Sequence, residues 1–302
     1  MFVEFTNSSN IHGVKYLGER SRHWSERAFW SITFLVSIIA FVVMITQIYY
    51  KWELAPSFDE KPTQVWRIPF PVVTICPETR VALRHLNFTE TYHKVHNTDK
   101  DDLTPEELRN IEALAQICDP ILFRNFSIGS NLEETEIVTL LKKITLSLHE
   151  SLSGCRWRNE YGDCSDFFNE IITEEGICYS FNDLNYNEIF KQDVVVTDFK
   201  LFNHNVSSTN WTLEKGYQTN LLETYPRRIL GRGTRAGINI ILKQNISDLD
   251  YICRLGTQGY KVLLHTPGEI PRISKQYFTV SLNQAVVVSV KPSMITTSKG
   301  LA

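Results

Sequence analysis

The sequence predicts an α+β membrane protein, in which one N-terminal transmembrane helix precedes a disulfide-bonded extracellular domain. Three observations indicate this class: residues 28–50 are uncharged and largely apolar, all six cysteines follow them, and short β-branched segments dominate the second half. The chain is 43% hydrophobic and 22% charged, which excludes a disordered chain and a protein of many membrane spans. Its net charge of −3 offers no basic surface for nucleic acid.

The apolar run is long enough to cross a bilayer. As a helix, residues 28–50 would extend roughly 35 Å, against a hydrocarbon core of about 30 Å. Aromatic residues flank the run, with Phe29 and Trp30 at one end and Tyr49 and Tyr50 at the other, as is typical of the two membrane interfaces. A cleaved signal peptide fits less well, because its apolar region is about 7–15 residues long and lies nearer the N-terminus.

Cysteines and glycosylation sequons indicate the orientation of the span. An even number of cysteines on one side suits an oxidising compartment. We therefore expect a cytosolic arm over residues 1–27, a transmembrane helix over 28–50 and an extracellular domain over 51–302. The sequons on the same side as the cysteines, each a candidate glycosylation site, are at Asn87, Asn125, Asn205, Asn210 and Asn245.

Within the extracellular part, a helical insert is expected to interrupt a mostly β body. Thr104-Pro-Glu-Glu107 has the pattern of a capping box, and residues 131–150 carry an apolar stripe at helical spacing. This assigns residues 79–154 to the insert, 68–78 and 176–302 to the β body, and 155–175 to a disulfide loop. The expected strands are 72–76, 178–181, 238–243, 260–265, 278–282 and 285–290.

The cysteine positions favour one disulfide pattern, although six cysteines allow 15 connectivities and the pattern stays a hypothesis. Two cysteines flank a short polar loop, and two others lie in expected strands that a bridge could join. The resulting pairs are Cys155–Cys164, Cys76–Cys178 and, by remainder, Cys118–Cys253.

One face of the expected span is small or polar. Two interpretations remain open: close packing against another membrane helix, or a surface that lines a pore. Both require partner helices. The residues of this face are Thr33, Ser37, Ala40, Met44 and Gln47.

Enzymatic chemistry finds little support in the sequence. It contains no HExxH or GxSxG motif and no closely spaced CxxC pair, so we expect no catalytic residue, metal site or cofactor. The Asp-x-Asp pairs at 99–101 and 248–250 are the only features that would suit a type II membrane glycosyltransferase. Such an enzyme shares the expected topology and is kept as an alternative.

Several short segments, in order, resemble the pickpocket branch of the degenerin/epithelial sodium channel family. The most specific is Phe70-Pro-Val-Val-Thr-Ile-Cys76, which resembles the family's FPxVTxC strand. Others are Ser9-Asn-Ile-His-Gly-Val-Lys-Tyr16, Trp24-Ser-Glu-Arg-Ala-Phe-Trp30, Gly176-Ile-Cys-Tyr-Ser-Phe-Asn182, Gly259-Tyr-Lys-Val-Leu-Leu-His-Thr-Pro-Gly-Glu269 and the stretch 288–301.

The resemblance implies a trimer of subunits around a sodium-selective, amiloride-blockable pore, with the β body as palm and the helical insert as finger. It assigns control of gating to His12 and Gly13, and it implies the pairs Cys76–Cys178 and Cys155–Cys164. Its implied partners are sodium ions, the lipid bilayer and other subunits, in a homo- or heterotrimer. Gating would pass from the extracellular domain to the span through residues 50–71.

The family's thumb, second span and selectivity filter would follow residue 302. We therefore expect a C-terminally truncated form, and a non-conducting regulatory subunit is a further alternative.

Overall fold

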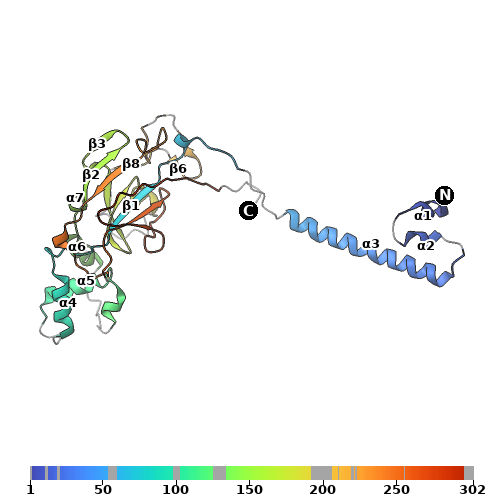
Figure 1. Ribbon diagram of the computed structural model, residues 1–302, viewed down its shortest axis with the longest axis horizontal. Coiled ribbons are helices and arrows are strands. Elements are labelled where there is room, and N and C mark those ends of the chain that lie inside the picture. Colours follow the sequence, from blue (N-terminus) through green and yellow to red (C-terminus); the bar gives the residue numbers. More distant parts are fainter. Residues whose placement is uncertain are drawn as a thin grey trace. The chain divides into compact units, whose positions relative to one another are not determined.

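The computed structural model divides into two compact units, one of Met1–Lys61 with Val290–Ala302 and one of Pro62–Ser289. Figure 1 shows the helices and strands of both. The residues that the structure describes are 2–10, 13–18, 21–53, 60–97, 103–124, 134–191, 206–209, 211–218, 221, 223–254 and 256–295.

The first unit is helical. Two short helices, α1 (Phe2–Ser8) and α2 (Val14–Gly18), precede the long helix α3 (Trp24–Glu53). The segment Trp24–Lys51 of α3 has a mean hydropathy of 2.5, and within the described residues it alone is long and apolar enough to cross a membrane. The expectation of one N-terminal apolar helix is confirmed, and α3 extends beyond the expected 28–50 at both ends.

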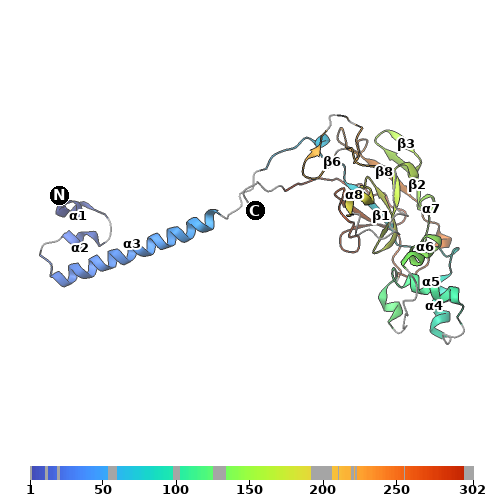
Figure 2. The same ribbon diagram turned by 180° about the vertical axis from the view of Figure 1, so that it is seen from behind.

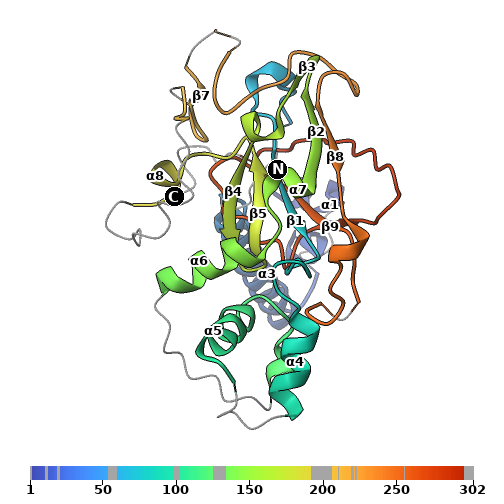
Figure 3. The ribbon, with the colours of Figure 1, turned by 90° about the vertical axis from the view of Figure 1, so that its left-hand side faces the viewer.

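The second unit is built on a five-stranded antiparallel sheet with the order β10-β9-β1-β5-β4 (Figure 3). The central strand β1 (Val72–Pro77) pairs with β5 (Gly176–Phe181) on one side and β9 (Tyr260–His265) on the other. Every residue of β1 and β5 is buried, which explains their continuous apolar runs. The outer strands are β4 (Phe168–Thr173) and β10 (Phe278–Val280).

A second sheet, of order β3-β2-β8, encloses the core with the first. The core combines residues of both sheets and has an aromatic centre, in which the Trp157 ring lies 5.0 Å from those of Phe70 and Phe181. These strands are β2 (Leu152–Trp157), β3 (Glu160–Gly162) and β8 (Ile238–Leu242), and a separate hairpin joins β6 (Trp211–Thr212) to β7 (Gly216–Tyr217).

Helices α4, α5 and α6 gather at one end of the second unit (Figures 1 and 2). They surround a second apolar core that includes Phe88, Leu114 and Leu141. The capping box expected at Thr104 is present, since its hydroxyl accepts from the Glu107 N–H and the Glu107 carboxylate accepts from the Thr104 N–H. The bounds are α4 (Phe88–Asn97), α5 (Pro105–Leu114), α6 (Glu134–Ile144), α7 (Leu148–Ser151) and α8 (Tyr186–Ile189). The 3₁₀ turns are Val65–Arg67, Pro120–Phe123, Cys164–Asp166 and Ile246–Asp248.

The single helix expected over residues 131–150 is two helices, α6 and α7, and its expected cap at Asn131 lies outside the described residues. The break follows from a second capping box: the Glu150 carboxylate accepts a hydrogen bond from the Ser147 N–H, which starts a new helix. The freed Leu146 carbonyl accepts from the Tyr179 hydroxyl, so the interruption leaves this group satisfied.

Two further expectations differ from the structure. Residues 285–290 form no strand, because among the described strands none pairs with them, and Val287 is 83% exposed. β10 ends at Val280, and Asn283 has a positive φ of 58°, which turns the chain. The stretch 155–175, expected as a loop, is mostly strand.

Candidate functional site: the N-terminal arm, the apolar helix and the disulfide-bonded sheet

Gly13 lies against the start of the long helix. Its φ is +90°, and a Cβ placed there would lie 3.1 Å from the Trp30 ring, so both its backbone and its surroundings favour glycine. The Tyr16 ring stacks on Trp30 at 4.8 Å, and the Arg22 guanidinium lies 4.6 Å from the centre of the Tyr16 ring. This stack joins α2 to α3. The other residue expected to control gating, His12, lies outside the described residues.

A second close approach joins α1 to α2, and sequence reasoning missed it. A Cβ at Gly18 would collide with the side chain of Thr6, which is fully buried. Glycine at this position therefore lets the two short helices pack directly on one another. Two glycines, Gly13 and Gly18, thus shape the N-terminal arm.

Two hydroxyl groups on the small or polar face of α3 form hydrogen bonds to backbone carbonyls of the same helix. The Thr33 hydroxyl donates to the Phe29 carbonyl and the Ser37 hydroxyl donates to the Thr33 carbonyl, both at 2.9 Å. These bonds satisfy the hydroxyl protons within the helix. Packing against a partner helix and lining a pore both remain compatible with this face, which Ala40, Met44 and Gln47 continue at helical spacing.

Three disulfides are formed. Two of them join segments far apart in the chain, and the third closes a short local loop. Cys76–Cys178 connects the neighbouring strands β1 and β5, with a sequence separation of 102. Cys118–Cys253 closes the helical part onto the segment before β9, with a separation of 135. Cys155–Cys164 spans only nine residues, between β2 and the following 3₁₀ turn. These are the pairs expected from the sequence.

Two of the five candidate glycosylation sites, Asn87 and Asn245, lie among the described residues, and both asparagines are exposed. Asn245 is exposed, its oxygen accepts from the Ser247 N–H, and the following Ile246 is 78% exposed. Asn87 immediately precedes α4, the Phe88 side chain that follows it is fully buried, and the Thr89 hydroxyl donates to the Asp250 carboxylate. Asn125, Asn205 and Asn210 lie outside the described residues.

A buried polar row crosses the main sheet, and no sequence motif predicted it. The Thr74 hydroxyl lies 2.9 Å from His265 Nε2, and the Ser180 hydroxyl donates to the Asp183 carboxylate at 3.4 Å. Burial raises the pKa of Asp183 to about 7 and lowers the pKa of His265. Thr74 and Ser180 are direct cross-strand partners, so the register of β1 and β5 brings these groups together.

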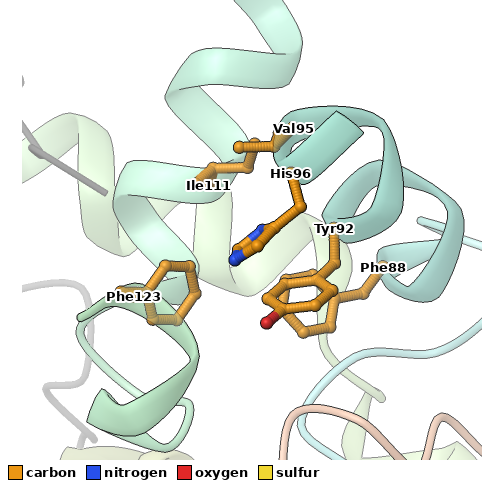
Figure 4. A pocket seen from close by; sticks show the side chains of 6 residues that line it. All are labelled: Phe88, Tyr92, Val95, His96, Ile111 and Phe123. Carbon is orange, nitrogen blue, oxygen red and sulfur yellow. The ribbon is translucent and has the colours of Figure 1, made fainter. Parts of the chain in front are cut away.

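A small pocket opens between α4, α5 and the turn Pro120–Phe123 (Figure 4). Figure 4 shows the His96 ring between Tyr92 and Phe123, and the Tyr92 and His96 rings are 4.3 Å apart. The other lining residues are Phe88, Val95 and Ile111. The few polar groups in this lining do not define a ligand. No group of three metal-ligating side chains occurs among the described residues.

The apolar helix α3, which is long enough to cross a membrane, and the disulfide-bonded α+β unit that follows it in the chain indicate a membrane protein. The chain belongs to the amiloride-sensitive sodium channel family, whose model matches residues 5–300. This match covers both structural units and confirms the resemblance drawn from the motifs. Because the family comprises ion channels, the expectation that the chain is not an enzyme is also confirmed.

Curated relatives give the comparison more detail. The chain is 28% identical to Pickpocket protein 28 of Drosophila melanogaster over 96% of its own length and 46% of that protein. It is 24% identical to Sodium channel protein Nach of Drosophila melanogaster, over 96% of its length and 52% of that protein. Human Acid-sensing ion channel 2 is 21% identical over 59% of the chain and 35% of its own length. The chain therefore spans about half the length of the first two relatives.

Proposed function

We propose that this protein is a subunit of a sodium-selective, amiloride-sensitive cation channel that carries sodium passively across the plasma membrane. The observation that carries this proposal is the family match over residues 5–300, which includes the apolar helix and the disulfide-bonded unit together. The name of one relative, Sodium channel protein Nach of Drosophila melanogaster, supports the same function.

The proposed topology places the N-terminal arm in the cytosol and the disulfide-bonded unit outside the cell. All three disulfides lie after α3, as an oxidising compartment would require. The exposed Asn245 is available for a glycan on the same side. In this arrangement α3 crosses the membrane in contact with lipid and with helices of other subunits.

Conduction by α3 requires other helices. A lone apolar helix cannot replace the hydration shell of a sodium ion, because conduction needs polar groups or backbone carbonyls along the path. We therefore propose that the protein functions in a trimer with identical or related subunits. In that trimer the face of Thr33, Ser37, Ala40, Met44 and Gln47 packs against or lines the central path.

Gating is proposed to involve both ends of α3. Gly13 and the stack of Arg22, Tyr16 and Trp30 connect the arm to the start of the helix. Rearrangement of the extracellular unit would act on the other end through residues 50–71.

The test is voltage clamp of oocytes that express the protein alone or together with Pickpocket protein 28. We expect the protein to co-purify with that relative and to contribute an inward current that amiloride blocks and that replacement of sodium by N-methyl-D-glucamine removes. Co-purification with a reduced current would favour the alternative of a non-conducting regulatory subunit. Absence of both co-purification and any change in current would contradict the proposal.

A further inference from the structure

The segment that leads from the direction of α3 into the main sheet is positioned mainly by hydrogen bonds. Residues 65–70, called the linker below, begin with a 3₁₀ turn and precede β1 in the chain. Apolar burial does little to fix this turn, because Trp66 is 43% exposed. Two buried polar residues, Asn182 and Arg228, form hydrogen bonds to the linker instead.

Asn182 binds the end of the linker that is nearer to β1. This residue follows β5, is only 1% exposed and has a φ of +67°, a conformation that asparagine adopts more readily than most residues. Its amide nitrogen donates to the Phe70 carbonyl at 2.6 Å and to the Arg227 carbonyl at 3.2 Å, while its amide oxygen accepts from the Arg227 N–H. The Phe70 N–H also donates to the Arg227 carbonyl, at 2.9 Å, so the three residues form a closed set of bonds.

Arg228 binds the linker at its 3₁₀ turn. Its Nη1 donates to the Trp66 carbonyl at 3.1 Å, and its Nη2 donates to the Leu221 carbonyl. The guanidinium also lies 4.5 Å from the centre of the Tyr217 ring of β7. A planar guanidinium can bridge several groups at fixed angles, which a lysine ammonium cannot reproduce. Arg228 therefore joins the linker to β7 and to the chain that follows β7.

Further bonds hold residues 226–228 between the hairpin of β6 and β7 and the core of the unit. The Tyr217 hydroxyl donates to the Pro226 carbonyl at 2.7 Å. Arg158, which follows β2, donates through Nη2 to the Arg228 carbonyl at 2.6 Å. A displacement of the hairpin is thus passed to residues 226–228, and these residues are bonded to the linker at two points.

We propose that Asn182 and Arg228 are positioning residues that couple the β6–β7 hairpin to the linker, and through the linker to α3. Asn182 ends one of the motifs behind the family resemblance, which gave this residue no role. The two contacts make the linker and residues 226–228 move together. The effect on α3 rests on the proposed channel function, whereas the coupling of hairpin and linker can be measured without any current.

Two variants remove the contacts, and each has a matched control. Asn182→Gly deletes the side chain and keeps the backbone, because glycine adopts a positive φ without strain. Its control is Asn283→Gly, at an exposed asparagine with a φ of +58°. Arg228→Met retains a long apolar side chain without its donors, and its control is Arg235→Met, at an exposed arginine before β8.

Hydrogen exchange of the full chain in detergent measures the contacts. We expect the Phe70 amide to exchange several-fold faster in Asn182→Gly and Arg228→Met than in the wild type, while the amides of β1 and β5 and both controls stay unchanged. Equal exchange of Phe70 in the wild type and Asn182→Gly would overturn the proposal. Faster exchange throughout β1 and β5 would do the same, because it would show general unfolding rather than a released linker.

A double-mutant cycle measures the coupling. Tyr217→Leu alters the hairpin at a side chain that contacts the Arg228 guanidinium. It should accelerate exchange of the linker amides in the wild type and should add nothing in Arg228→Met, because residues that act through one another are not additive. A purely structural role of each residue predicts additive effects, and additive effects would overturn the proposal.

Voltage clamp of oocytes that also express Pickpocket protein 28 tests the effect on α3. We expect the sodium current per molecule at the cell surface to fall several-fold in Asn182→Gly and Arg228→Met, and Arg228→Lys, which keeps one donor, to recover part of the loss. An unchanged current with a faster-exchanging linker would overturn the coupling to α3. A wild-type protein that adds no current would contradict the proposed channel function, and the exchange cycle would still decide the coupling of hairpin and linker.

Discussion

Gly13 occupies a backbone conformation that other residues adopt only with strain. Its φ of +90° and the Trp30 ring 3.1 Å from any added Cβ impose two independent restrictions. The ring is held by Tyr16 on α2, which limits how far it can move away. The contact between the arm and α3 therefore depends on the absence of a side chain at residue 13.

We expect Gly13→Ala to weaken this contact by about 1 kcal/mol or more, which is the usual scale of strain at a positive φ. In the co-expression experiment, the sodium current per molecule at the cell surface should change several-fold, with unchanged surface expression. Gly231→Ala is the matched control, because a Cβ there meets nothing within 4 Å. Equal currents for both variants would show that the arm does not control gating through Gly13.

The buried Asp183 carboxyl makes the free energy of unfolding decrease as pH rises. Burial raises its pKa from 3.8 to about 7, so between these values the folded state holds a proton that the unfolded state has lost. Its stabilising contribution is complete below the unfolded pKa and is lost as pH rises through 7. Burial lowers the pKa of His265, and this acts in the opposite sense as pH falls.

Asp183→Asn removes this titration and isolates its contribution. The unfolding midpoint of the variant, minus that of the wild type, should rise as pH increases from 5 to 8. Glu174→Gln is the control, because hydrogen bonds from Ser274 lower the pKa of that exposed carboxyl and it stays ionised over this range. Parallel pH profiles for wild type and Asp183→Asn would contradict the assignment.

At the scale of elements, α5 depends on the capping box at its start. The Thr104 hydroxyl accepts from the Glu107 N–H at 3.3 Å, and Glu107 also pairs with Lys94 of α4 at 2.7 Å. These bonds, with the Lys94 hydrogen bond the largest cause, lower the pKa of Glu107 to about 2. The box therefore fixes both the start of α5 and its contact with α4.

Thr104→Ala should destabilise α5 by about 1 kcal/mol, the usual cost of a lost N-cap. Hydrogen exchange of the first-turn amides of α5 measures this directly. Thr104→Ser retains the hydroxyl and should exchange as the wild type does. Equal acceleration in both variants would mean that the threonine methyl, rather than the cap, stabilises the helix.

The elements that could be predicted from the sequence are those marked by a pattern of neighbouring residues. Strands β1, β5 and β9 are short apolar runs, and α5 begins at a recognisable capping box, so each appeared at nearly its observed bounds. The break between α6 and α7 was missed because the Ser147 box falls inside an uninterrupted apolar stripe. Residues 285–290 have strong β propensity, yet a strand also needs a partner, which no local pattern supplies.

The candidate site also contains residues that the sequence predicted and residues that it did not. Gly13 and the cysteines belong to motifs or simple spacings, and the sequence indicated them. The buried contact of Thr74 with Ser180 and the ion pairs of Glu175 with Arg80 and Arg254 join segments far apart in the chain. Only the register of the main sheet brings them together, so the sequence contained no local signal for either.

At the scale of the whole molecule, Cys118–Cys253 fastens the helical part to the segment before β9. Its sequence separation of 135 is the largest of the three disulfides, and the cost of losing a disulfide increases with the loop it closes. Cys118 and Cys253 both lie in the apolar core of the helices. The helical part should therefore lose order first when this bond is removed.

Replacing Cys118 and Cys253 by serine should lower the free energy of unfolding by roughly 3–5 kcal/mol, measured from urea denaturation. The same replacement at Cys155 and Cys164, which are nine residues apart, should cost less. Limited proteolysis of the first variant should cut near α4 and α5 before the sheet. A larger loss for the short-range pair would contradict this view of the fold.

We propose that α3 crosses the membrane once, with the N-terminal arm in the cytosol and the disulfide-bonded unit on the opposite side. Protease protection in sealed microsomes, with an epitope tag before Met1, measures this most directly. We expect added protease to remove the tag while a large fragment stays protected. Glycosidase should reduce the mass of that fragment, and it should no longer do so when Asn245 and the other four candidate asparagines are all replaced by glutamine. A protected tag with a digested, unglycosylated disulfide-bonded unit would contradict the account.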